Sequence, residues 1–243
     1  MAVDAALLAH ARRTGEVTLR TYEWSQRTLS LGRHERARGL YDADRLAQHG
    51  VDVVRRPTGG RALLHHRELT YSVTAPCHGA SLAESYRAIN ILLLAALSQL
   101  GVEVSESPRS TRSLRPEGAA CFAEPSAGEL VWRGAKLAGS AQLREDGALL
   151  QHGAILIEDD QALISALRTG EATPVGGVAR VATLRDALGK SVAPSEVSDA
   201  LQAALANLLG APGPIPALDP AFLRPDLARL EGAFRDPAWT WRR

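Results

Sequence analysis

The sequence predicts an α+β fold in which a mixed or antiparallel sheet is covered by flanking helices. Short runs rich in β-branched and aromatic residues, bounded by Gly, Pro and polar residues, indicate several strands. Longer segments repeat apolar residues at helical spacing. Strands and helices follow one another without a regular βαβ alternation, which favours α+β over a doubly wound parallel fold.

The strands are predicted from composition and from the turns between them. A Pro57-Thr58-Gly59-Gly60 turn separates the third strand from two short runs, 61–65 and 69–74, that we expect to form a pair. Tight polar turns join the last three candidates. The expected strands are residues 17–24, 28–31, 51–55, 61–65, 69–74, 130–132, 136–142 and 149–157.

The helices are predicted from periodicity and capping signals. Ser81 and Glu84 form a capping-box pattern ahead of residues 82–100, and Gly101 is placed to end that helix. The polar stretch 105–120, which contains Pro and Gly, is expected to be a mobile loop. The expected helices are residues 2–13, 82–100, 159–168, 195–209 and 225–234, with a partly helical segment within 32–50.

The composition is that of an ordinary globular protein, with 45% hydrophobic and 23% charged residues among 243. We expect a single domain over residues 1–243 with a peripheral tail at 211–243. A net charge of +1 argues against nucleic-acid binding. No apolar run is long enough to span a membrane, and the first ten residues carry Asp4 without a basic start, so neither a membrane partner nor secretion is expected.

The two cysteines, Cys77 and Cys121, do not make a disulfide framework, and without an export signal they favour a reducing cytoplasm. A free cysteine beside apolar residues, such as Cys121 before Phe122, is most often inert packing. Cys77 lies in a turn before the long helix. Together with His65 and His66 it shows no compact ligand spacing, so no metal site is expected.

The segment from Arg55 to Arg61 is the first candidate site. Gly59 and Gly60 let backbone amides approach a ligand closely, and Arg56 with its arginine neighbours supplies charge for an anion. A Gly-Gly pair between two strands is also typical of an ordinary hairpin, and both interpretations stay open. The spacing is not that of a Walker loop, because no Gly-Lys-Ser/Thr follows.

The second candidate site surrounds Lys136, one of only two lysines in a chain with 26 arginines. A lysine that points outward from an edge strand carries no information. One that points inward needs a ligand carbonyl, thiolate or phosphate to meet it. Gly139, Ser140 and Ala141 leave room for a ligand against the backbone. His152, among apolar residues of the next strand, is more often a satisfied core histidine than a catalyst.

Together these segments resemble the biotin/lipoate protein ligase and octanoyltransferase family over most of the chain. Residues 1–8 resemble the family's opening helix and 55–65 its ligand-binding loop. Residues 136–142 resemble its lysine strand, and Gln151-His152-Gly153 the strand beside it. The resemblance implies a class II synthetase-like catalytic domain. His66 is a departure, because the family commonly has Asp after the loop histidine, His65.

Within that family the motifs are most similar to an octanoyltransferase type known from Gram-positive bacteria. That type has Thr-Gly-Gly-Arg-Ala, Glu-Leu-Thr-Tyr-Ser and Cys-Phe, which occur here at 58–62, 68–72 and 121–122. The other octanoyltransferase type carries its cysteine after the His-Gly strand, where residues 157–170 have none. The alternatives are an ATP-dependent lipoate ligase, which typically has a third glycine in place of Arg61, and an amidotransferase between lipoyl domains. A non-catalytic acyl-binding protein would not need Cys121 and Lys136.

The resemblance implies a two-step acyl transfer. Cys121 would take octanoyl from octanoyl-acyl carrier protein as a thioester, and a lysine of a lipoyl domain would then take it as an amide. Lys136 would stabilise the thiolate and the oxyanion. No cofactor is implied, because the thioester is already activated. The implied acceptors are lipoyl-domain proteins, namely E2 subunits of 2-oxoacid dehydrogenases and the H protein of glycine cleavage. The implied substrate-binding residues are Arg56, Thr58, Gly59, Gly60, Arg61, His65, Ser72, Gly139, Ser140, Ala141, His152 and Gly153.

Overall fold

The computed structural model describes residues 1–107, 128–170, 181–211, 213 and 215–243. The Cys121-Phe122 motif lies outside the described residues, as does most of the segment expected to be a mobile loop. Residues 105 and 106 of that segment form a short strand, β6 (Ser105–Glu106).

The described strands form two sheets. The larger is antiparallel throughout, with the order β1-β5-β9-β8-β7-β6, and the smaller has the order β3-β2-β4 with β2 and β3 parallel. The predicted α+β class with a mixed or antiparallel sheet is therefore confirmed. The strand bounds are β1 (Thr18–Tyr22), β2 (Thr28–Leu31), β3 (Asp52–Arg55), β4 (Leu63–His65), β5 (Glu68–Pro76), β7 (Leu130–Trp132), β8 (Ala135–Glu145) and β9 (Ala148–Leu156).

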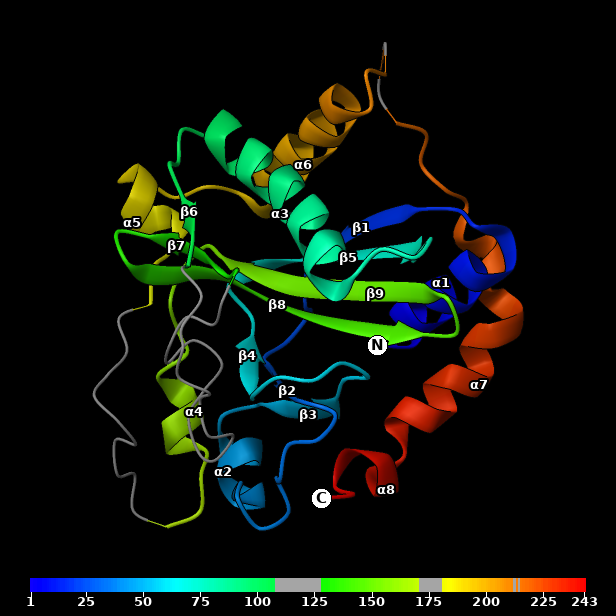
Figure 1. The fold of residues 1–243 in the computed structure, drawn as a ribbon. Coiled ribbons are helices and arrows are strands. Elements are labelled where there is room, and N and C mark those ends of the chain that lie inside the picture. Colours follow the sequence, from blue (N-terminus) through cyan, green and yellow to red (C-terminus); the bar gives the residue numbers. More distant parts are fainter. Residues whose placement is uncertain (108–127, 171–180, 212, 214) are drawn as a thin grey trace.

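The helices cover the sheets from outside. In Figure 1, α3 (Leu82–Gln99) and α6 (Pro194–Leu208) cross one face of the large sheet, and the small sheet lies beneath its other face. None of the described helices is long and apolar enough to cross a bilayer. The remaining helices are α1 (Ala2–Thr14), α2 (Ala43–Gln48), α4 (Leu163–Ala166), α5 (Leu184–Leu188), the 3₁₀ turn η1 (Pro220–Leu223), α7 (Arg224–Arg235) and α8 (Pro237–Thr240).

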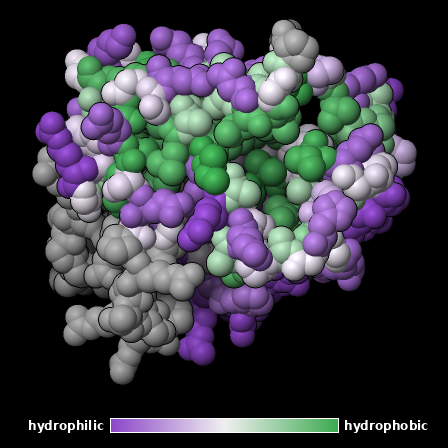
Figure 2. Space-filling view, turned by 45° about the horizontal axis from the view of Figure 1, so that its top comes forward, coloured by the Kyte–Doolittle hydropathy of each residue, from purple (hydrophilic) through white to green (hydrophobic). Residues whose placement is uncertain are grey.

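The long helix α3 begins as the sequence predicts. The Ser81 hydroxyl accepts a hydrogen bond from the Glu84 amide, and the Glu84 carboxylate accepts one from the Ser81 amide, so both halves of the capping box are present. Its apolar stripe packs into the main core. Leu82, in its first turn, stays more than half exposed. On the face shown in Figure 2, hydrophobic side chains gather around a hollow in the surface.

Strand β5 shows how the chain separates core from site. Leu69, Tyr71 and Val73 belong to the core cluster that also contains the inner sides of α3 and α6. Successive residues of a strand face opposite sides of the sheet, so the buried polar residues Thr70 and Ser72 face away from those helices. A polar row at this position places hydroxyl groups between the two sheets.

Two predicted elements differ from the structure. Residues 61–65 and 69–74 do not pair, because β4 joins the small sheet beside β2 while β5 joins the large one. The other edge of β4 is occupied by a side chain, since the Gln161 amide accepts from the Leu64 N–H and donates to the Leu64 carbonyl. The helix expected over 159–168 is limited to the four residues of α4.

Gly153 of β9 has no room for a side chain beside β8 and Tyr71. A Cβ added there would lie 2.4 Å from the Gly139 carbonyl oxygen and 2.7 Å from Cε1 of Tyr71. Gly153→Ala should therefore lower the free energy of unfolding by about 1–3 kcal/mol, as overpacking typically does. Gly232→Ala, whose Cβ would meet nothing within 4 Å, is the matched control and should not destabilise the protein. The measurement is urea unfolding of both variants, and equal stability would contradict this account.

Asp4 of α1 is the most buried acid of the sheet–helix junction, with no exposed surface. Its carboxylate accepts hydrogen bonds from Arg20 at 2.7 Å, from the Ser72 hydroxyl at 3.0 Å and from Tyr22 at 3.2 Å. Burial by itself raises the pKa of Asp4. The hydrogen bond from His152 and the nearby positive charges outweigh burial, so the net pKa is lowered below its ordinary value.

This lowered pKa predicts the direction of acid destabilisation. Above a pH of about 4, both folded and unfolded Asp4 are ionised and its contribution to stability is fully present. Below that pH the unfolded chain binds a proton that the folded chain does not, so the contribution is lost as pH falls. Asp4→Asn should lose roughly 1–3 kcal/mol at neutral pH and show a flatter decline in acid. Urea unfolding between pH 7 and pH 3 measures this, with the exposed Asp199→Asn as control. A decline as steep in Asp4→Asn as in the wild type would contradict it.

Candidate active site

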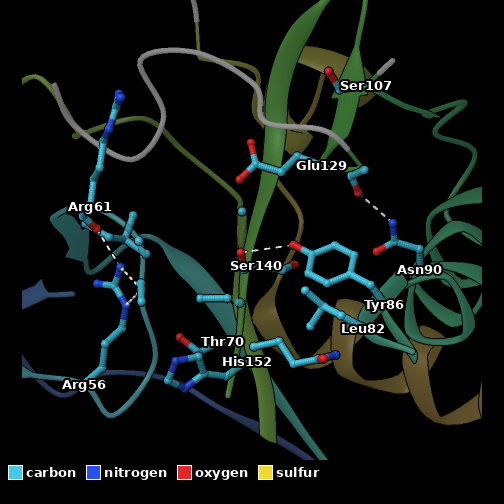
Figure 3. Close-up of a pocket in the computed structure, with 18 of the residues that line it drawn as sticks. Arg56, Arg61, Thr70, Leu82, Tyr86, Asn90, Ser107, Glu129, Ser140 and His152 are labelled. Atoms are coloured by element: carbon cyan, nitrogen blue, oxygen red, sulfur yellow. Dashed lines mark hydrogen bonds between the residues drawn. The ribbon is translucent and has the colours of Figure 1, made fainter. Parts of the chain in front are cut away.

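A pocket of about 1040 Å³ opens between α3, the open side of β8 and the loop that follows β3. In Figure 3, Leu82, Tyr86 and Asn90 reach in from α3, while Arg56 and His152 lie on the opposite side of β8. Glu129 lies toward the other end of the pocket from His152. Most of the predicted site residues line this pocket: Arg56, Gly59, Gly60, Arg61, His65, Gly139, Ser140, Ala141, His152 and Gly153.

The Gly-Gly segment is a crossover loop and not a hairpin. Strands β3 and β4 flank it in sequence, but β2 lies between them in the sheet. The Arg56 guanidinium, which is nearly buried, holds the loop by its carbonyl groups, with Nη2 donating to Gly59 O at 2.9 Å and to Arg61 O at 2.7 Å. Its Nη1 donates to Ser30 of β2. Arg56 therefore shapes the loop through its hydrogen bonds to main-chain carbonyl groups.

Glu35 also holds the same loop in place. Its carboxylate accepts hydrogen bonds from the Gly32 and Ala62 amides, each at 3.0 Å. Burial raises the pKa of Glu35, although these hydrogen bonds and the neighbouring arginines oppose the shift. Gly32 has no room for a side chain, because a Cβ would lie 1.9 Å from the Gly60 carbonyl oxygen. Glu35 was not predicted from the sequence.

Thr58 does not line the pocket but connects the loop to the large sheet. Its hydroxyl lies 2.6 Å from Nε2 of His152 on β9, and Nδ1 of His152 lies 3.4 Å from the Asp4 carboxylate. Ser72 was predicted to bind substrate, but its hydroxyl donates to Asp4 instead. Burial lowers the pKa of His152 below its ordinary value, and the Asp4 carboxylate only partly opposes this. Among the predicted residues, Thr58, Ser72 and His152 thus form one buried cluster with Asp4.

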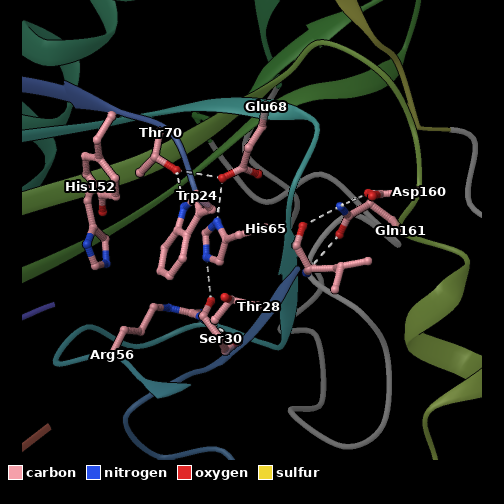
Figure 4. Close-up of polar contacts among 12 residues, drawn as sticks. Trp24, Thr28, Ser30, Arg56, His65, Glu68, Thr70, His152, Asp160 and Gln161 are labelled. Carbon is pink, nitrogen blue, oxygen red and sulfur yellow. Dashed lines mark hydrogen bonds and ion pairs between the residues drawn. The ribbon is translucent and has the colours of Figure 1, made fainter. Parts of the chain in front are cut away.

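His65 is held in a second buried network, shown in Figure 4. Its Nδ1 lies 2.5 Å from Glu68, its Nε2 lies 2.8 Å from the Ser30 hydroxyl, and its ring stacks on Trp24 with centroids 4.3 Å apart. The Thr70 hydroxyl donates to Glu68 and accepts from the Trp24 indole. His65 therefore borders the pocket as a fixed ring.

His66, the residue that departs from the family pattern, does not belong to the pocket. Its Nδ1 lies 2.8 Å from the Asp160 carboxylate, on the segment before α4. Burial raises the pKa of Asp160, and the hydrogen bond from His66 opposes that shift. His66 does not line the pocket. The pair ties the turn after β4 to the segment that follows β9.

Lys136 points inward from β8 and is 1% exposed, so of the two orientations that the sequence leaves open the structure has the buried one. Its ammonium donates to the Glu129 carboxylate at 2.6 Å, and Glu129 lines the pocket. A buried ion pair of this kind needs both partners, because the removal of one leaves an uncompensated charge. Glu129, just before β7, was not predicted, since a single acid ahead of a short strand gives no distinctive sequence signal.

The open edge of β8 forms the middle of the pocket wall. Strand β7 pairs with β8 only as far as Ala138, so Gly139, Ser140 and Ala141 have no strand partner on that side among the described residues. The Tyr86 hydroxyl donates to the Ser140 carbonyl at 3.1 Å. Burial raises the pKa of Tyr71 to about 12, which keeps its phenol protonated beside the Ser140 hydroxyl, 2.6 Å away.

This arrangement can hold a narrow chain against small residues, with a buried ammonium–carboxylate pair at one end. Within the described part of the chain, no group of three or more His, Cys, Asp and Glu side chains is arranged to hold a metal ion. Asp4 was also not predicted, although an acid among Ala6, Leu7 and Leu8 on the buried side of an amphipathic helix could have been recognised as a partnered one.

Comparison with known proteins identifies the family. The lipoyl protein ligase A/B catalytic domain matches residues 1–206. The octanoyltransferase LipM of Kyrpidia tusciae is 38% identical and aligned over 100% of this chain and 94% of its own length. That of Symbiobacterium thermophilum is 41% identical over 86% and 81% of the two chains. Among solved structures, a putative lipoate protein ligase from T. acidophilum with bound lipoic acid has a TM-score of 0.78 at 21% identity, covering 99% of this chain and 92% of its own. The chain belongs to the lipoyl protein ligase A/B catalytic-domain family.

Proposed function

We propose that this chain is an octanoyltransferase of lipoate biosynthesis, which moves octanoyl from an acyl-carrier thioester to a lysine of a lipoyl domain. The observation that carries the proposal is the agreement of the curated relatives. Those at 38–45% identity are named octanoyltransferase, and two of them align with most of this chain. The motifs that distinguish this type from the ligases, at 58–62, 68–72 and 121–122, are present in the sequence.

The pocket supports this proposal through its shape. An acyl chain has no hydrogen-bonding groups and packs against any surface that is apolar and close. Gly139, Ala141 and Gly153 provide a wall without bulky side chains, and Leu63 and Leu82 add apolar surface. The volume of about 1040 Å³ lies at the upper end of typical small-molecule sites. It leaves space for more than an eight-carbon chain, as the arm of an acyl carrier would need.

The first step forms an acyl-enzyme at Cys121. The thiolate attacks the thioester carbonyl, the new C–S bond forms, and the bond to the carrier's sulfur breaks, so that the carrier leaves as a thiol once it takes up a proton. The ammonium of Lys136 stabilises the thiolate and the oxyanion of the tetrahedral intermediate. Glu129 keeps this ammonium in position through its 2.6 Å hydrogen bond.

The second step transfers the acyl group. The neutral amine of the acceptor lysine attacks the Cys121 thioester, an amide bond forms, and the bond to the Cys121 sulfur breaks. The proton lost by the amine balances the thiolate that is released. No nucleotide enters either step, because the thioester already carries the activation that a ligase obtains from ATP. The likeness to a lipoate-protein ligase A bound with ATP, at 22% identity and a TM-score of 0.78, concerns the fold alone.

Incubation with octanoyl-acyl carrier protein in nucleotide-free buffer should add one octanoyl group to the intact protein. Intact-protein mass spectrometry should show this adduct in the wild type and in Cys77→Ser, and not in Cys121→Ser. Cys77 is the matched control because it is half-buried in a turn, where its sulfur accepts a hydrogen bond from Arg144.

Three outcomes would each change the assignment. An adduct that survives Cys121→Ser would place the acyl group elsewhere. Efficient use of octanoate with ATP, without use of the carrier thioester, would favour the ligase. Acylation by an octanoylated lipoyl domain, and not by the acyl carrier protein, would favour the amidotransferase.

Lys136→Arg should be nearly as damaging as Lys136→Ala, with a loss on the order of 10²-fold or more in the rate of acyl transfer. The small neighbours of Lys136 leave little width for a planar guanidinium, which also places its donors farther out. Both variants should also lower the melting temperature, because Lys136→Ala leaves the buried Glu129 carboxylate without a compensating charge and Lys136→Arg forces a wider group into a buried position.

Steady-state transfer and thermal melting of both variants measure these effects. Lys190→Arg, at an exposed position, is the matched control and should match the wild type. A Lys136→Arg enzyme with a near wild-type rate would mean that only diffuse positive charge is required.

A further inference from the structure

His152 is held from both sides of its ring by groups of different chemistry. On one side Nδ1 lies 3.4 Å from Oδ2 of Asp4, and on the other Nε2 lies 2.6 Å from the Thr58 hydroxyl. Asp4 and Thr58 have no exposed surface, and His152 is 5% exposed. The line Asp4–His152–Thr58 therefore runs from α1 through β9 to the loop that borders the pocket.

The donors and acceptors along this line follow from the chemistry of its ends. An ionised carboxylate only accepts hydrogen bonds, so Nδ1 of His152 carries the proton that it donates to Asp4. In the neutral ring the other nitrogen is then an acceptor, and Nε2 accepts the hydrogen bond of the Thr58 hydroxyl. Thr58 cannot turn to another partner without leaving a buried nitrogen unpaired.

The charged and titratable groups around His152 are consistent with a neutral ring. The Asp4 carboxylate of α1 raises the pKa of His152, whereas Arg56 of the loop and the amino group of Met1 lower it. Burial lowers this pKa most strongly. The positive charge near Asp4 comes from the amino group of Met1 and from Arg20 of β1, which lies at 2.7 Å. His152 is therefore neutral, with one defined tautomer.

We propose that Asp4 is a positioning residue for acyl transfer, which fixes the tautomer of His152 and through it holds Thr58 and the loop against the pocket. This inference rests on the proposed function. It assigns His152 as a wall of the pocket and not as a base, since both ring nitrogens are engaged away from any substrate. The neighbouring residues Gly59 and Gly60 then have a fixed place on the pocket wall.

Thr58→Val removes only the hydroxyl and tests the line without disturbing the buried acid. Steady-state transfer from octanoyl-acyl carrier protein should show KM raised roughly 5- to 10-fold, the effect of losing one buried hydrogen bond, with kcat changed less. Thr58→Ser should recover most of the loss. Thr74→Val is the matched control, because the Thr74 hydroxyl is buried and has no hydrogen-bond partner among the described residues, and it should match the wild type.

Nitrogen NMR of ¹⁵N-histidine-labelled protein reads the tautomer directly. In the wild type at pH 8, Nδ1 of His152 should be protonated and Nε2 unprotonated. His152→Gln keeps a donor and an acceptor on one side chain and should keep kcat within about 10-fold, whereas loss of a catalytic base would cost on the order of 10²-fold or more.

The outcomes separate this inference from the proposed function. If the wild type transfers octanoyl but Nε2 carries the proton, or Thr58→Val equals Thr74→Val, or His152→Gln loses 10²-fold in kcat, the positioning role is overturned while the function stands. If the wild type transfers no octanoyl from any acyl carrier or lipoyl domain, the proposed function fails, and the tautomer measurement still decides the Asp4–His152–Thr58 line.

Discussion

The burial of one carboxylate, that of Asp4, determines how the parts of this protein meet. A charge without solvent must be surrounded by donors, and those donors come from Arg20 and Tyr22 of β1, Ser72 of β5 and His152 of β9. Helix α1 can therefore dock in only one register on the large sheet. Because His152 also contacts Thr58, the same carboxylate fixes the small sheet's loop relative to the large sheet.

Three other charged side chains of the site are also bound by groups of the protein itself. Arg56 binds carbonyl groups of its own loop, Glu35 binds the amides of Gly32 after β2 and of Ala62 in the loop, and Lys136 is paired with Glu129. In each case a charge is satisfied before any ligand arrives. The orientation of these side chains is thus set by the protein itself.

Much of the fold could be predicted from the sequence, because most elements carry local signals. The capping box at Ser81 and the helical spacing after it predict α3, and the composition of residues 149–157 predicts β9. The assignment of β4 and β5 to different sheets could not be predicted, because it depends on the distant Gln161 side chain that occupies the edge of β4.

The candidate site, too, could be predicted only in part from the sequence. The loop glycines, Lys136 and His152 are unusual for their local context and could be recognised, and the family that they indicate is confirmed. Which residues pair with Glu129 and with Asp4 could not be predicted, because pairing across seven or 148 positions is a property of the folded chain. Ser72 lies in a motif that the sequence identifies. The direction of its side chain could not be predicted, because it depends on which face of β5 the site occupies.

The adjacent arginines Arg55 and Arg56 hold two different parts of the structure in place. Arg56 reaches the pocket loop, whereas Arg55, fully buried, donates to the carbonyls of Gly32, Glu35 and Thr240. Arg56 thus holds the loop that borders the pocket, and Arg55 holds the C-terminal segment at the same end of β3. Three acceptors in different directions suit a planar fork of five donors and not an ammonium. Mechanical disturbance of the C-terminal segment would consequently be transmitted to the pocket through a single peptide bond.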